Sequence, residues 1–69
     1  MENIKENIGE QIELQRKISK LTRKELGEKV GVSYQQIQNY ETGKQNITVE
    51  RLAKISEALN YPLTNFFNN

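Results

Sequence analysis

The 69-residue sequence contains no cysteine, no histidine and no tryptophan, and every acidic residue in it is glutamate. Without cysteine and histidine, disulfides and the usual zinc ligand sets are excluded. Without aspartate, calcium-binding loops and Ser-His-Asp triads are not expected either. We therefore expect no metal, no cofactor and no small-molecule ligand. No nucleophile–base pair is evident, so the chain is not expected to be an enzyme.

Long apolar runs are also missing. No stretch approaches the roughly 18 apolar residues that predict a membrane span. Residues 1–6 lack the apolar core of a signal peptide. The sequence therefore predicts a cytoplasmic protein that does not associate with membranes. Alternation with a period of two residues is absent too, which at this length favours one small all-α domain.

The net charge is only +1, but the charge is unevenly distributed. Residues 1–15 carry −3, residues 16–44 carry +4, and residues 45–69 are neutral. A basic middle segment is typical of a surface that attracts an anionic partner. A solvated helix face rich in lysine has the same composition, so charge alone leaves both interpretations open.

Apolar residues between residues 4 and 18 recur at the spacing of one helix face. Gly9 would cost about 1 kcal/mol inside that helix, so we expect its firm part to begin there. Residues 1–7 would then be a frayed N-terminal extension of the helix, and residues 8–69 would form the domain. The predicted stripe consists of Ile4, Ile8 and Ile12, with Leu14 and Ile18 beside it.

Capping residues predict two short helices in the middle of the chain. Thr22 with Glu25 and Ser33 with Gln36 match the capping-box pattern, in which the two side chains satisfy each other's backbone N–H groups. Gly31 lies between the two boxes and suits the left-handed turn that ends a helix. Two short capped helices joined through such a turn are typical of a helix-turn-helix motif.

The C-terminal third predicts two more helices, which makes five in all. The fourth begins at Thr48 and ends at Asn60, both suitable capping residues. A short fifth helix, from Leu63 to Phe67, follows a proline. We expect Phe66 in the core. Leu63 and Phe67 would share a face of an α-helix, so we expect them at a dimer interface.

The central sequence resembles the phage repressor and Cro-like helix-turn-helix DNA-binding family, also called the xenobiotic-response-element type. The residues that carry the resemblance are Leu21 to Ser33, Ile37, Tyr40-Glu41 and Gly43-Lys44. It extends from about Ile8 to Phe67 and implies a compact five-helix, lambda-repressor-like fold with 33–41 as recognition helix. The chain departs from the family at Arg23, where glutamine is frequent, and at Gly27, where alanine is frequent.

The predicted recognition helix offers amide side chains to a DNA duplex. With Ile37 and Tyr40 facing inward, the opposite side carries glutamine and asparagine, whose paired donors and acceptors suit the edge of adenine. We expect readout that favours A·T pairs, with Tyr34 against a thymine methyl group or a phosphate. The alternative is a neutral polar surface. The base-reading candidates are Tyr34, Gln35, Gln38 and Asn39.

Phosphate contacts are expected on both sides of this helix. The first turn of the preceding helix has free N–H groups that favour anions. The loop after the recognition helix adds further polar groups. The candidates are Thr22, Arg23, Lys24, Thr42, Lys44, Gln45 and Asn46. The resemblance also implies a structural ion pair between Arg16 and Glu41, because similar proteins pair the aligned arginine and glutamate.

The resemblance implies a sequence-specific transcriptional regulator that binds double-stranded DNA. It would act as a homodimer on a two-fold symmetric operator, with repression as the simplest mechanism. An antitoxin that represses its own operon and a restriction-modification controller are alternatives on the same fold. A protein-interaction module that lacks DNA binding is an alternative from another class. A salt titration separates that module from a DNA-binding protein, because phosphate contacts make affinity salt-dependent.

Overall fold

Four α-helices and one 3-10 helix make up the fold of the computed structural model, which describes residues 4–67 and the side chains from residue 7 onward. The elements are α1 (Ile4–Ile18), α2 (Arg23–Val30), α3 (Tyr34–Glu41), α4 (Val49–Leu59) and η1 (Leu63–Phe66). No strand occurs between residues 4 and 67, which confirms the all-α class for that part. The fifth predicted α-helix is wrong in type, because η1 is a 3-10 turn.

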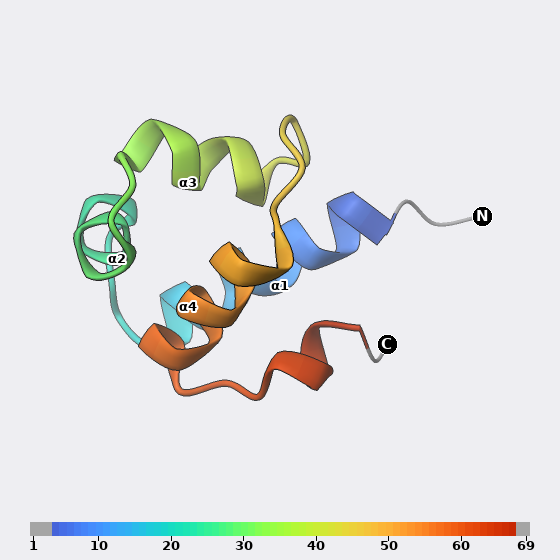
Figure 1. The fold of residues 1–69 in the computed structure, drawn as a ribbon. Coiled ribbons are helices and arrows are strands. Elements are labelled where there is room, and N and C mark those ends of the chain that lie inside the picture. The colour runs from blue at the N-terminus through green and yellow to red at the C-terminus, as the bar shows by residue number, and fades with distance from the viewer. Residues whose placement is uncertain (1–3, 68–69) are drawn as a thin grey trace.

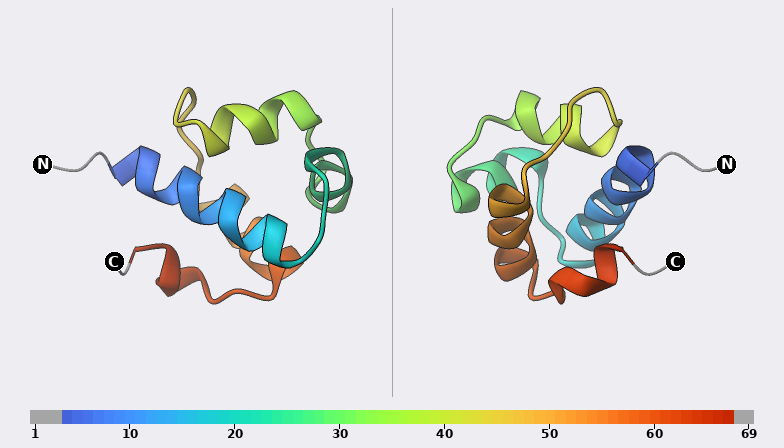
Figure 2. Two further views of the ribbon diagram at one scale, coloured as in Figure 1. Left: turned by 180° about the vertical axis from the view of Figure 1, so that it is seen from behind. Right: turned by 45° about the vertical axis from the view of Figure 1, so that its right-hand side comes forward.

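The helices surround one core. In Figure 1, α3 lies along one edge, α2 is seen end-on beside it, and α4 crosses in front of α1. Figure 2 shows α1 and η1 side by side, in agreement with the contacts between these two elements. The ten buried apolar residues come from every element: Ile8, Ile12, Leu26, Val30, Ile37, Tyr40, Leu52, Ile55, Leu59 and Phe66.

The first helix extends on both sides of Gly9. Within the described residues it is helical from Ile4, so Gly9 lies in its interior. A Cβ atom on Gly9 would lie 2.3 Å from the carbonyl oxygen of Tyr40 and 2.6 Å from that of Glu41. The glycine therefore allows α1 to cross the end of α3 closely. The predicted frayed extension over residues 1–7 lies partly outside the described residues, which exclude residues 1–3.

The outer stripe of α1 is not part of the core. Leu14 and Ile18 are 48% and 63% exposed. At 100° per residue, Leu14 points about 200° away from Ile12, so the two cannot pack against the same neighbours. Arg16 takes the core-facing position instead and is 8% exposed.

One predicted capping box is complete and the other is half formed. The Thr22 hydroxyl accepts from the Glu25 N–H at 3.0 Å, and the Glu25 carboxylate accepts from the Thr22 N–H at 2.8 Å. Hydrogen bonding of the Glu25 carboxylate to the Thr22 backbone, and secondly to the Thr22 side chain, lowers the pKa of this carboxyl. Ser33 caps α3 by accepting from the Gln36 N–H, but the Gln36 amide donates to the Tyr40 hydroxyl at 2.6 Å instead of reaching back.

The C-terminal segment closes the core with one of its two phenylalanines. Phe66 is 1% exposed, as expected, and meets the ring of Tyr61 edge-on at a centroid distance of 5.0 Å. Phe67 is 53% exposed, whereas Leu63 packs partly against the core. Because a 3-10 helix repeats every three residues, Leu63 aligns with Phe66. The expected common face of Leu63 and Phe67 does not form.

Candidate nucleic-acid interface

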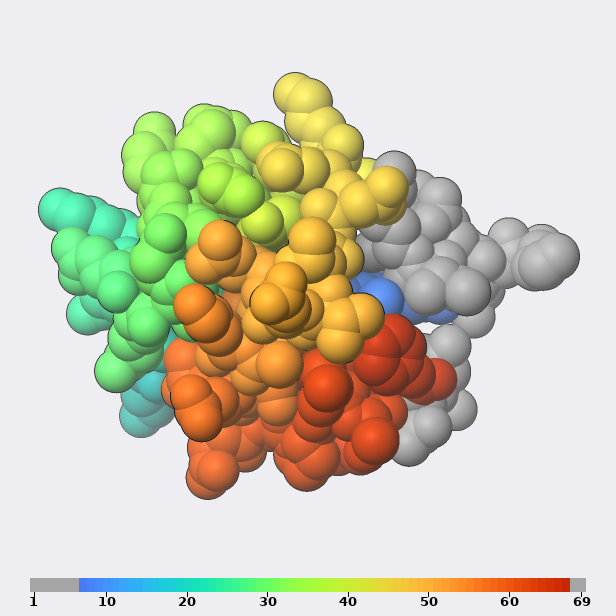
Figure 3. Space-filling model, viewed as in Figure 1, coloured from blue at the N-terminus to red at the C-terminus, as the bar shows by residue number. Residues whose placement is uncertain are grey.

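Helix α3 buries one side and exposes the other. Ile37, Tyr40 and Glu41 form its buried side. The loop that follows α3 projects at the same edge of the molecule, and in Figure 3 its yellow atoms extend beyond the green helix. Helix and loop together therefore present one polar surface to a partner.

The four base-reading candidates lie on the accessible part of α3. Tyr34 is 57% exposed, Gln35 is exposed, and Gln38 and Asn39 are half-buried. The Gln35 amide donates to the Asn39 side-chain oxygen at 3.4 Å, and the Asn39 amide donates to the Gln45 side-chain oxygen at 3.5 Å. In this row each α3 amide keeps a free N–H and an acceptor lone pair, the two groups that recognise adenine in the major groove.

The phosphate candidates divide into free and engaged groups. Lys24 and Lys44 are exposed, and neither forms an ion pair with another residue of the described chain. The Thr42 hydroxyl donates to the Gln38 carbonyl at 3.0 Å, which ties it to α3. The remaining candidates with exposed side chains are Thr22, Gln45 and Asn46.

Arg23 is paired with carboxylates, whereas the sequence predicts a cation free to contact a phosphate. Its Nε donates to Glu41 Oε1 at 2.9 Å, and its Nη2 lies 3.5 Å from Glu13 Oε2. The side chain is 31% exposed. A guanidinium held by two carboxylates is directed into the protein, so Arg23 differs from the neighbouring Lys24 although both begin α2.

Arg16 and Glu41 form a buried ion pair between α1 and α3. Arg16 Nε donates to Glu41 Oε2 at 2.6 Å and Nη2 donates to Oε1 at 3.3 Å. The third guanidinium nitrogen donates to the Leu21 carbonyl at 2.8 Å. With side-chain exposures of 9% and 1%, the two charges have little access to water and depend on each other.

Two residues in this framework were not singled out from the sequence. Glu13 Oε2 lies 3.4 Å from Lys17 Nζ and also faces Arg23. The four-residue spacing of Glu13 from Lys17 was a usable signal. Arg51 donates to the Val30 carbonyl at 2.8 Å and so satisfies the end of α2 from α4. That contact joins residues distant in sequence, and no local sequence pattern predicts it.

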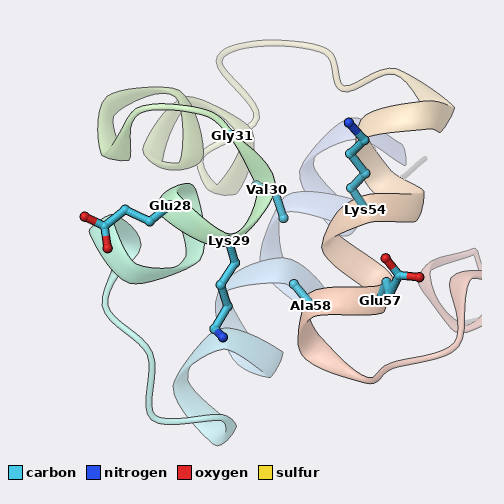
Figure 4. A pocket seen from close by; sticks show the side chains of 7 residues that line it. All are labelled: Glu28, Lys29, Val30, Gly31, Lys54, Glu57 and Ala58. Carbon is cyan, nitrogen blue, oxygen red and sulfur yellow. The ribbon is translucent and has the colours of Figure 1, made fainter.

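A shallow groove elsewhere on the surface does not resemble a ligand site. It lies between the end of α2 and α4 and is lined by Glu28, Lys29, Val30, Gly31, Lys54, Glu57 and Ala58 (Figure 4). Figure 4 shows the charged ends of its lysines and glutamates pointing in different directions rather than converging. Ligand sites generally have convergent polar groups in an apolar pocket. Among the side chains of residues 7–67, no cluster of three or more potential metal ligands is present.

Comparison with known proteins places the chain in a family. A sequence profile described as "Helix-turn-helix" matches residues 12–66. The chain belongs to the helix-turn-helix family of Cro/C1 type, whose members are non-enzymatic DNA-binding transcription regulators. No helix in the described part of the chain has the length and apolar character needed to cross a membrane.

Individual similarities agree with this assignment. An HTH-type transcriptional regulator of Rhizobium meliloti is 38% identical over 63 residues, which cover 91% of this chain and 45% of that protein. The chain thus spans just under half the length of this relative. The P22 c2 repressor, solved in complex with a synthetic operator, is 32% identical with a TM-score of 0.80, covering 86% of this chain and 89% of the repressor.

A protein with lower sequence identity also has this fold. The clp gene regulator ClgR from Corynebacterium glutamicum gives a TM-score of 0.91 over 97% of this chain and 87% of its own. At 24% identity this similarity supports the fold alone.

Proposed function

We propose that this chain is a sequence-specific DNA-binding transcriptional regulator, acting in the cytoplasm, that inserts α3 into the major groove. The observation that carries the proposal is the row of accessible amides on α3. Gln35 and Asn39 keep donors and acceptors free, while Ile37 and Tyr40 anchor the opposite side of the helix in the core. A recognition helix needs one side fixed in the core and an opposite side whose polar groups are accessible to base edges.

Free cations on both sides of α3 support the same docking. Lys24 lies in the first turn of α2, and Lys44 lies in the loop after α3. Both are exposed, so a backbone phosphate can approach each of them. Together with the exposed polar groups of Thr22, Gln45 and Asn46, they would orient α3 without reading sequence themselves.

A homodimer on a two-fold symmetric operator is the assembly we propose for this surface. One copy of α3 reads only a few base pairs, and two copies in successive major grooves, about 34 Å apart, supply a longer site. The exposed ring of Phe67 is the apolar group near the C-terminus that a partner copy could cover. Occupying an operator in this way represses transcription by denying access to the polymerase.

Binding to duplex DNA over a range of salt concentrations tests the proposed function. The logarithm of the association constant should fall linearly with the logarithm of salt concentration, since each phosphate contact releases counterions. Fluorescence anisotropy with a labelled duplex gives the slope. Affinity that is absent or indifferent to salt would favour the protein-interaction module instead.

A further inference from the structure

The position of Arg23 suits a phosphate contact, but its ion pairs do not. It stands at the first position of α2, where a free cation would meet the DNA backbone. Its guanidinium is nevertheless within ion-pair distance of two carboxylates, Glu41 on α3 and Glu13 on α1. The next residue, Lys24, is exposed and forms no ion pair with another side chain that the structure describes.

The ion pair between Arg23 and Glu41 connects α2 and α3. The turn around Gly31 joins the last residue of α2 to the start of α3. Arg23 is the first residue of α2 and Glu41 is the last residue of α3, so their 2.9 Å bond joins the other ends of the same two helices. The pair of helices is thus held at both ends, by the chain at one and by an ion pair at the other.

The burial of Glu41 also argues against a phosphate-binding role for Arg23. Arg16 and Arg23 both pair with Glu41, while Arg23 and Lys17 both lie within ion-pair distance of Glu13. If Arg23 turned to a phosphate, Glu41, whose side chain is 1% exposed, would lose one of its two cationic partners. Leaving a buried carboxylate less fully paired is unfavourable.

We infer that Arg23 is a positioning residue that fixes α3 against α2 and α1, and that it makes no phosphate contact. Its planar guanidinium directs Nε to Glu41 and Nη2 to Glu13 in a fixed geometry, which the single ammonium nitrogen of a lysine cannot reproduce. The inference rests on the proposed DNA binding for its consequence and on the cluster geometry for its cause. The consequence is that Arg23 supports recognition of a particular sequence but not general attraction to DNA.

The experiment compares Arg23→Gln, Arg23→Lys and the matched control Lys24→Gln on a selected operator and on an unrelated duplex, across salt concentrations. Circular dichroism first establishes that each variant is folded. Lys24→Gln should weaken binding to both duplexes and reduce the salt slope by about 1. Arg23→Gln should weaken operator binding several-fold while the salt slope and the affinity for the unrelated duplex stay at wild-type values. Arg23→Lys should behave like Arg23→Gln although it keeps the charge.

The inference is overturned if Arg23→Gln lowers the salt slope as Lys24→Gln does, or if Arg23→Lys binds the operator like wild type. A double-mutant cycle of unfolding with Arg23→Gln and Glu13→Gln tests the cluster without DNA, and it should give a coupling of a few-fold in the folding equilibrium. If wild type binds no duplex, the proposed function fails, and the cycle alone decides. Measured coupling then supports Arg23 as a positioning residue, and zero coupling overturns it.

Discussion

At the scale of single residues, Gly9 decides how closely two helices approach. The carbonyl oxygens of Tyr40 and Glu41 occupy the place that a side chain on Gly9 would need. These are backbone atoms, so they cannot rotate away as the end of a long side chain could. From the sequence alone Gly9 is a weak point of the helix, whereas the structure makes it the condition for packing α1 against α3.

Gly9→Ala should therefore destabilise the protein. Helix propensity favours alanine by about 1 kcal/mol, but overpacking against backbone costs about 1–3 kcal/mol and should outweigh it. Urea unfolding measures the difference. Ala53→Gly, at an exposed position inside α4, measures the propensity contribution alone. A Gly9→Ala variant as stable as wild type would mean that α1 and α3 are less closely packed than described.

Glu25 should give the stability a measurable pH dependence. Its hydrogen bonds with Thr22 lower the pKa of its carboxyl below the ordinary value of 4.5. Because the pKa is lower in the folded state, this stabilisation is fully present above the unfolded-state pKa and is lost as pH falls through the folded-state pKa. The stability gap between wild type and Glu25→Gln should thus be larger at pH 7 and shrink on acidification below 4.5.

Thermal unfolding over this pH range measures the gap. Glu28→Gln serves as the control, since Glu28 is exposed on the same helix and forms no side-chain hydrogen bond or ion pair with the side chains of residues 7–67. Its gap to wild type should change less with pH. A Glu25→Gln gap that is constant from neutral to acidic pH would contradict the linkage between the cap and stability.

At the scale of helices, contacts between residues close in sequence were easier to predict than contacts between residues distant in sequence. Thr22 with Glu25 predicted the start of α2 correctly, because a cap is a contact between residues three apart. Gln36 fits the same pattern, but the Tyr40 hydroxyl offers its amide a different partner. The last helix is a 3-10 turn whose Phe66 is buried in the core, and the local sequence pattern did not predict this helix type. The same holds for Arg23, whose partners are distant in sequence.

Arg16→Met should be strongly destabilising, because Arg16 links α1 to α3 through Glu41. Removing one partner of a buried pair leaves the other charge without its main compensation and costs about 3–5 kcal/mol. Arg23 remains beside Glu41, so we expect the free energy of unfolding to fall by about 3 kcal/mol, the lower end of this range. Denaturant unfolding gives the value, and Lys17→Met at the exposed neighbouring position is the control. Equal stabilities for the two variants would show that the pair is unimportant.

Truncation of Gln35 on α3 and of Lys44 in the following loop should affect DNA binding differently. Gln35→Ala should cost about 1–3 kcal/mol on the preferred site and relax the preference at one base pair, because a base contact is lost. Lys44→Ala should weaken binding to all sequences alike, because a phosphate contact is lost. Competition binding with a panel of single-base variants measures both. The reverse pattern would mean that α3 docks in another orientation.

At the scale of the whole molecule, the all-α class and the helix-turn-helix were predictable from composition, apolar spacing and caps. The buried and exposed sides of α3 were predictable too, since Ile37 and Tyr40 define the inward direction and the amides follow on the other side. The ion-pair cluster beneath that face was predictable only in part. The pair of Arg16 and Glu41 was predicted from a family resemblance. The contacts of Arg23 with Glu13 and Glu41 form only when α1, α2 and α3 are assembled.

The most direct test of the α3 reading surface is selection of bound fragments from a random duplex pool, followed by sequencing. We expect enrichment of two related half-sites in inverted orientation, rich in A·T pairs at the positions that α3 reads, with centres separated by about one helical turn of DNA. Recovery of fragments with no shared sequence, or with a shared sequence that Gln35→Ala leaves unchanged, would contradict the account.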